Sequence, residues 1–118
     1  MTAAFVSRET ILAAPDIQTE TVEVPEWGGA VRVRGMTAGE RDSFDTAVTD
    51  ARRAKKPTMV RARLVMLTTV DGEGGRLFTE ADLPALDAKS GAALDRLWEV
   101  AARLSGIGAR DTEDLEKN

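Results

Sequence analysis

The chain has 118 residues and a formal net charge of −4, with an apolar and charged content typical of a folded protein. It contains no cysteine and no histidine, which excludes disulfides, thiol nucleophiles, and the commonest general base and metal ligand. We therefore expect no enzymatic activity, no catalytic residue, no cofactor and no metal site. No apolar run approaches the roughly 20 residues that cross a bilayer, and the first residues lack a signal-peptide pattern. These features predict a cytosolic protein without a membrane partner.

The first predicted element is a short helix after Ser7, which reaches Ala14 and is ended by Pro15. The residue before a proline avoids the helical region, so the chain has to leave the helix at this point. A loosely docked helix and a helix with a functional role are equally compatible with this pattern.

A β-hairpin is predicted at about residues 19–34. Valines alternate with polar residues over 21–24 and again over 31–34, which is the period of a half-buried strand. Between the two runs, Pro25 and the pair Gly28 and Gly29 favour a tight turn. Trp27 at its tip either folds back onto the core or anchors a partner.

Four further helices are predicted after the hairpin. They cover residues 37 to about 55, residues 58 to about 69 with Pro57 as a possible first residue, a short stretch from residue 79, and residues 91–104. The second of these is apolar over more than half its circumference, so it should be the central buried helix. The side chains expected in the core are Leu64, Leu67, Leu94, Leu97 and Trp98.

These elements predict a mainly α protein with one antiparallel β-hairpin, a small α+β fold of about five helices around a single core. We expect one globular domain over residues 1–108. The segment 109–118 is polar and charged, and it is predicted to be a mobile acidic tail.

A basic stretch lies between residues 52 and 63. Its six cations are not interrupted by an acid, and they are Arg52, Arg53, Lys55, Lys56, Arg61 and Arg63. It could be a solvated surface, a docking patch for an acidic protein, or a nucleic-acid contact. Because the stretch has no aromatic residue for base stacking and the whole chain is acidic, we expect no nucleic-acid binding.

The overall pattern resembles a known family. A hairpin containing PEWGG is followed by VRVRGMTAGERDSF, and the similarity continues in GRLFTEADLPALDAKSGAALDRLWEVAARLSGIG and in the opening FVSRETILAA. In these segments the chain is similar to the tail assembly chaperones of long-tailed bacteriophages. The resemblance covers nearly the whole chain, but it includes no catalytic motif.

That resemblance implies a function. Such chaperones coat the tape-measure protein, keep it soluble and help recruit tail-tube subunits during tail morphogenesis, and they leave before the virion matures. It implies a location in the host cytoplasm and a possible longer product made by ribosomal frameshifting, which would extend the acidic tail. The alternative is a small cytosolic regulatory adaptor or nucleic-acid-binding protein that uses the basic stretch 52–63.

Self-association is a further expectation. A two-stranded hairpin is marginal in water, and its edge would be unpaired if only two strands exist. We therefore expect weak oligomers with the hairpin at or near the contact. The candidate partner-binding residues are Trp27, Val31, Val33, Arg52 and Arg53.

Overall fold

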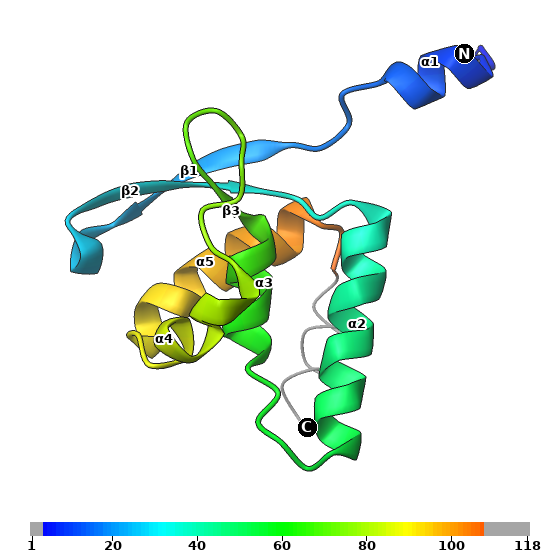
Figure 1. Ribbon diagram of the computed structural model, residues 1–118. Helices are drawn as coiled ribbons and strands as arrows, with labels where there is room; N and C mark the ends of the chain where they lie inside the picture. Colours follow the sequence, from blue (N-terminus) through cyan, green and yellow to red (C-terminus); the bar gives the residue numbers. More distant parts are fainter. Residues whose placement is uncertain (1–3, 108–118) are drawn as a thin grey trace.

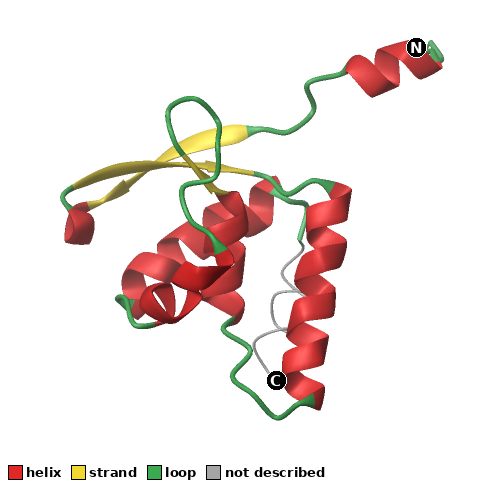
Figure 2. Ribbon diagram, in the orientation of Figure 1, coloured by secondary structure: helices red, strands yellow, loops and turns green. Residues whose placement is uncertain are grey.

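The computed structural model describes residues 4–107, and it confirms the small α+β fold. Within these residues, five α-helices and two 3-10 turns accompany a three-stranded antiparallel sheet (Figures 1 and 2). In chain order the elements are α1 (Arg8–Ala13), β1 (Thr19–Val24), η1 (Pro25–Trp27), β2 (Gly29–Arg34), α2 (Ala38–Arg53), α3 (Val60–Thr68), β3 (Thr69–Val70), η2 (Glu80–Asp82), α4 (Leu83–Asp87) and α5 (Gly91–Leu104). No helix in the described range is both long and apolar enough to cross a membrane. The predicted boundary at residue 108 and the predicted acidic tail lie outside the described residues.

The sheet contains the predicted hairpin and one strand that the sequence did not reveal. β1 pairs with β2 from Thr19 opposite Arg34 to Val24 opposite Gly29. β3 then pairs antiparallel with β2, which places β2 in the middle of the sheet. The premise that β2 is an unpaired edge of a two-stranded hairpin is therefore wrong.

The core lies where α3 and α5 pack under the sheet (Figure 1). Val22 and Val24 are buried on this side, because the alternation of β1 turns every second side chain toward the helices. The predicted core residues are all buried: Leu64, Leu67, Leu94, Leu97 and Trp98. The ring centroids of Trp98 and Phe44 lie 6.5 Å apart, so α2 also contributes to the core through Phe44.

The connection between α2 and α3 differs from the prediction. Pro57 does not begin α3, because Met59 adopts a left-handed backbone conformation with a φ of 48° and the helix starts at Val60. Lys55, just after α2, is also left-handed with a φ of 56°. Residues other than glycine rarely adopt this conformation, so the loop between the two helices is conformationally strained at both ends.

The backbone at the end of the hairpin passes very close to the backbone at the end of α5. A Cβ added to Gly35 would lie 2.5 Å from the carbonyl oxygen of Leu104. Beside this contact, the amide of Met36 donates a 2.9 Å hydrogen bond to the Ser105 hydroxyl. Glycine at position 35 therefore allows the chain to leave the sheet directly over the C-terminus of α5.

The N-terminal helix does not share in the core. α1 has the predicted Ser7 cap, whose hydroxyl accepts a 3.1 Å hydrogen bond from the Thr10 amide. None of its residues is buried, and Figure 1 shows it standing away from the rest of the protein. The folded body in the described range therefore begins at β1.

Candidate functional site

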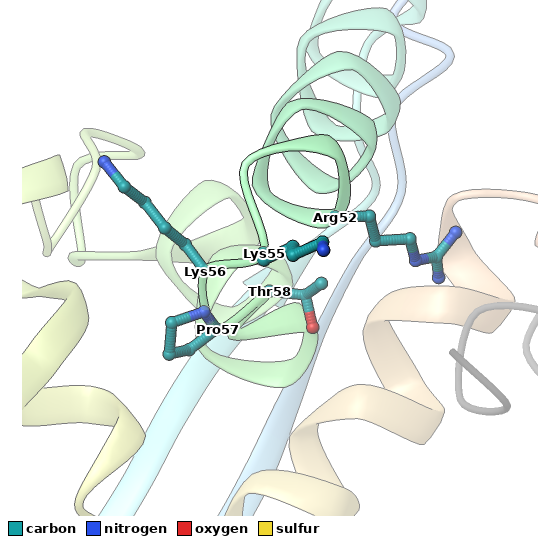
Figure 3. Close-up of a pocket in the computed structure, with 5 residues that line it drawn as sticks. All are labelled: Arg52, Lys55, Lys56, Pro57 and Thr58. Carbon is teal, nitrogen blue, oxygen red and sulfur yellow. The ribbon is translucent and has the colours of Figure 1, made fainter.

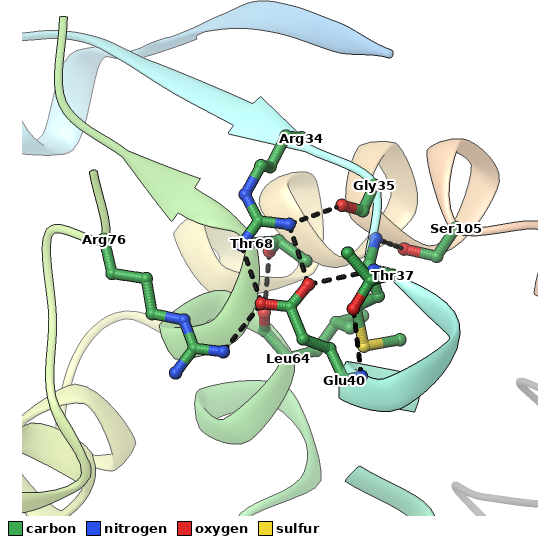
Figure 4. A network of polar contacts seen from close by, with 9 residues as sticks. Arg34, Gly35, Thr37, Glu40, Leu64, Thr68, Arg76 and Ser105 are labelled. Atoms are coloured by element: carbon green, nitrogen blue, oxygen red, sulfur yellow. Dashed lines mark hydrogen bonds and ion pairs between the residues drawn. The ribbon is translucent and has the colours of Figure 1, made fainter. Parts of the chain in front are cut away.

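A polar network joins the sheet to the start of α2 (Figure 4). Its centre is the Glu40 carboxylate, which accepts hydrogen bonds of 2.8 and 2.7 Å from the Arg34 guanidinium and one of 2.6 Å from Arg76. The same carboxylate accepts the Thr37 amide at 2.9 Å, while the Thr37 hydroxyl accepts the Glu40 amide at 3.1 Å. These last two bonds form the capping box that closes the first turn of α2.

The network holds Glu40 ionised. Hydrogen bonds from Arg34 lower the pKa of the Glu40 carboxyl far below its ordinary value, partly opposed by burial and reinforced by Arg76 and the Thr37 amide. The Glu40 carboxylate correspondingly raises the pKa of Arg34. Because every polar contact of Glu40 is internal, this network orients α2 and provides no reactive group.

The hairpin is tied to α5 by two ion pairs. Arg96 binds both carboxylate oxygens of Glu26 at 2.8 and 3.1 Å, and Arg103 binds those of Glu20 at 2.8 and 3.0 Å. The hydrogen bond from Arg96 lowers the pKa of the Glu26 carboxyl. The hairpin tip is therefore held over α5 and does not project freely.

The candidate residues in the hairpin differ in how deeply they are buried. Trp27 is half-buried against the core, and so is Val31. Val33 is fully buried and has no surface for a partner in this conformation. Of the three candidate residues in the hairpin, Trp27 and Val31 therefore keep side-chain surface that a partner can contact.

The basic stretch 52–63 is dispersed over the surface. Arg61 pairs with Asp95, and Arg63 donates to the Thr58 carbonyl at 2.9 Å and lies 3.7 Å from Glu80. A hollow of about 540 Å³ is lined by Arg52, Lys55, Lys56, Pro57 and Thr58, and Arg53 is exposed nearby in sequence. Figure 3 shows the side chains of Arg52 and Lys56 pointing in opposite directions. The cations of the hollow therefore do not converge on one point.

A groove between α2 and α3 was not anticipated from the sequence. It consists of two adjoining hollows of about 260 and 500 Å³ that share Ala47, Arg63 and Glu80. We call it the α2–α3 groove, and its defining residues are Ala47, Ala54, Met59, Arg63, Met66 and Glu80. The alanines of α2 are too short to fill the space toward α3. Their spacing along α2 was the one available signal, but it is also the spacing of an ordinary helix face.

Taken together, these surfaces are typical of a small protein that contacts other macromolecules. Within residues 4–107 no group of three or more histidine, cysteine, aspartate or glutamate residues could hold a metal ion. The candidate sites are shallow grooves, half-buried apolar residues and ion pairs on a small α+β scaffold, an arrangement suited to contacts with other macromolecules.

The particular family follows from comparison with known proteins. A model of the phage tail assembly chaperone family matches residues 7–118, and the chain belongs to this family. The structure of the bacteriophage HK97 tail assembly chaperone is similar to this chain, with a TM-score of 0.59 and 20% sequence identity over 81% of this chain and 94% of that chain. No curated protein sequence matches the chain.

Proposed function

We propose that this protein binds and solubilises the tape-measure protein and helps to recruit tail-tube subunits while the phage tail is built. The observation that carries the proposal is its membership of the phage tail assembly chaperone family over residues 7–118. In this role the protein acts without catalysis or a cofactor. It works in the host cytoplasm and is absent from the mature virion.

The surface of the described residues supports such a role in physical terms. A chaperone for an amphipathic helical client needs apolar surface that is accessible and adaptable. The α2–α3 groove includes two methionines, whose flexible side chains can adjust to different partners. Helix-in-groove binding is a common way to recognise an amphipathic segment.

Co-expression with the tape-measure protein encoded near this gene tests the proposal. We expect the tape-measure protein to move from the insoluble to the soluble fraction and to co-purify with several copies of this chain. An unrelated acidic domain of similar size is the control for a general effect of co-expression. If the tape-measure protein is equally insoluble with and without this chain, the proposed function is wrong.

Recruitment of tail-tube subunits is a separate part of the proposal. A longer frameshifted form, extended beyond residue 118, could supply the contact with the tube protein. Mass spectrometry of the products expressed from the intact gene would detect such an extension. Pull-down of the tube protein by the long and short forms would then show which form binds it.

We also propose that the basic stretch does not bind nucleic acid. Arg61 and Arg63 are paired with carboxylates, and the side chains of Arg52 and Lys56 at the hollow point in opposite directions (Figure 3). Titration with labelled duplex and single strands at low salt should give no binding in the micromolar range. Micromolar binding that weakens steeply with salt and is lost in an Arg52→Glu/Arg53→Glu variant would instead support the adaptor or nucleic-acid-binding alternative.

Self-association belongs to the same proposal, because a long client needs several copies along its length. Trp27 at the hairpin tip is the candidate contact, with Val31 beside it in the half-buried part of β2. Sedimentation over a wide concentration range should detect weak oligomers that Trp27→Ala weakens. A strict monomer at high concentration would remove this part of the proposal.

A further inference from the structure

Most of the exposed apolar side chains in the described range belong to one short segment. Of the large apolar residues that are exposed there, Phe5, Val6, Ile11, Leu12 and Ile17 lie before β1. We call residues 5–14 the N-terminal arm. Phe5 is fully exposed, and Ile11 and Leu12 are 56% and 68% exposed, so the large apolar side chains of the arm keep most of their surface in solvent.

The arm is built as a helix despite this exposure. Ser7 caps it, and Val6 and Ile11 occupy the two positions of a hydrophobic staple around that cap. A helix of six residues is nevertheless too short to be stable alone in water, and most helices gain their stability from packing an apolar face. The arm therefore has the features of a segment that is completed by a partner.

The base of the arm is fixed to the body. The Gly35 amide donates a 3.0 Å hydrogen bond to the Gln18 carbonyl, and the Asp16 amide donates one of 3.0 Å to the Ala14 carbonyl. Pro15 lies inside the turn that the Asp16–Ala14 bond closes, and its ring restricts the backbone there, while the Gly35–Gln18 bond holds the end of the connection to the body. The connection therefore directs the arm away from the body, as Figure 1 shows.

Within residues 4–107, the chain also has a groove whose lining can receive apolar side chains. The α2–α3 groove is lined by alanine and methionine together with charged side chains, among them Arg63 and Glu80, and its two hollows adjoin at Ala47 on α2. The small side chains at Ala47 and Ala54 allow another helix to approach the backbone of α2 closely. Ile11 and Leu12 are the exposed apolar side chains that the helix of the arm presents for such a groove.

The charges beside the two surfaces are also complementary. The arm carries Arg8 and Glu9, which form an exposed ion pair of 3.7 Å with each other and whose side chains are 77% and 78% exposed. The groove presents Glu80, which is 79% exposed, together with Arg63 and the exposed Lys56. A docked arm can therefore place its cation near Glu80 and its anion near a cation of the groove.

We propose that the N-terminal arm of one copy docks in the α2–α3 groove of a second copy. The contact would bury Ile11 and Leu12 of the arm against Ala47, Ala54 and Met59 of the groove. It does not depend on the identity of the client, and it is separate from the hairpin contact considered above.

Disulfide trapping tests this contact directly, because the natural chain has no cysteine and each introduced thiol is unique. A Leu12→Cys chain is mixed with a size-tagged Ala54→Cys chain and oxidised mildly. We expect a heterodimer on a non-reducing gel. The matched control is a tagged Thr49→Cys chain, since Thr49 is exposed on α2 but does not line the groove. Its yield of heterodimer should be at least fivefold lower.

Sedimentation provides a second measurement on the full chain. Leu12→Asp in the arm and Ala54→Glu in the groove should each weaken self-association by tenfold or more. Leu12 is exposed in the single chain, so the melting temperature of Leu12→Asp at low concentration should not change. That result separates loss of association from loss of folding.

Three results would overturn the proposal. Equal trapping at Ala54→Cys and Thr49→Cys would show that the arm does not select the groove. A dilute chain with both Leu12→Cys and Ala54→Cys that closes only an internal disulfide would show that the arm docks on its own body. Unchanged association of Leu12→Asp would exclude the arm from the contact between copies. A client that stays insoluble would not affect any of these readouts.

Discussion

The N-terminal arm and β1 lie next to each other in the sequence, and each carries large apolar side chains, yet their burial is opposite. Val22 and Val24 of β1 are buried, whereas Ile11 and Leu12 of the arm are exposed. β1 is paired along its whole length with β2, and this pairing holds its valines against α5. No residue of α1 is buried. In these two segments burial thus follows from the backbone pairing that positions β1, and apolar content alone does not determine it.

The largest effect that separates the two regions should come from Leu97→Ala in α5. Leu97 is 1% exposed, so the substitution removes buried apolar surface and leaves a cavity. We expect the free energy of unfolding to fall by about 2–5 kcal/mol. Denaturant unfolding of the wild-type and variant chains measures this loss.

The matched substitution in the arm is Leu12→Ala, which removes the same atoms from an exposed position. It should change the free energy of unfolding of the dilute chain by less than about 0.5 kcal/mol. A large loss with Leu12→Ala, or none with Leu97→Ala, would break the distinction between body and arm.

The second effect in size should come from Gly35→Ala. The new Cβ would lie 2.5 Å from the Leu104 carbonyl oxygen, so the hairpin and α5 would have to separate. We expect a loss of roughly 1–3 kcal/mol in unfolding free energy, the usual cost of overpacking. Gly39→Ala is the control, because beyond its own turn of α2 no atom lies within 4 Å of the added Cβ. That control should leave the stability unchanged or increase it, and a loss equal to that of Gly35→Ala would contradict the steric explanation.

The third effect tests the charge at the centre of the polar network. Glu40→Gln keeps a residue that can complete the capping box but removes the charge that Arg34 and Arg76 share. At pH 7 we expect the free energy of unfolding to fall by about 1–2 kcal/mol.

The pH dependence of this effect follows from the direction of the pKa shift. The folded pKa of Glu40 lies below its ordinary value of 4.5, so the folded state binds the proton less readily than the unfolded state. The stability that the charge contributes is fully present above pH 4.5 and is lost as the pH falls below it. Chemical unfolding of both chains at several pH values should show their difference shrinking below pH 4.5. A difference that is constant across this range would mean that the charge is not responsible.

The smallest effect should come from Arg96→Gln at the exposed hairpin tip. The ion pair between Arg96 and Glu26 is partly exposed to solvent and Arg103 still ties the hairpin to α5, so we expect only a small change in stability. The sensitive measurement is titration of the Glu26 carboxyl by NMR, because Arg96 holds its pKa below the ordinary value. In Arg96→Gln the pKa of Glu26 should rise toward that value. An unchanged titration would mean that Arg96 does not contact Glu26 in solution.

Much of the fold could be predicted because its elements have clear local signals. The hairpin follows from valine alternation, and Thr37 and Ser90 cap α2 and α5 as expected. By contrast, β3 is two residues long, too short to show any alternation, and its existence depends on its pairing with β2. The delayed start of α3 also escaped prediction, because the left-handed conformation of Met59 depends on the path of the whole loop.

The candidate sites were harder to predict than the fold. The sequence indicates that Trp27 either folds back onto the core or anchors a partner, and the structure places it half-buried against the core. Val33 was a candidate only because β2 was assumed to be an edge. The α2–α3 groove depends on the distance between two helices, which no pattern within either helix can specify. The exposure of the arm was likewise not determined by its apolar sequence.

The Glu40 carboxylate binds Arg34, Arg76 and the Thr37 amide at once, so the start of α2 responds to movements of the segments that carry the two arginines. Arg76 reaches Glu40 from the segment that follows β3, while Arg34 reaches it from the sheet. A molecule that displaces the loop carrying Arg76 removes one of the two guanidinium groups from the carboxylate that also holds the Thr37 amide. Hydrogen exchange at that one amide would then speed up even though nothing touches α2. The Thr37 amide proton can thus report a partner that moves the loop carrying Arg76.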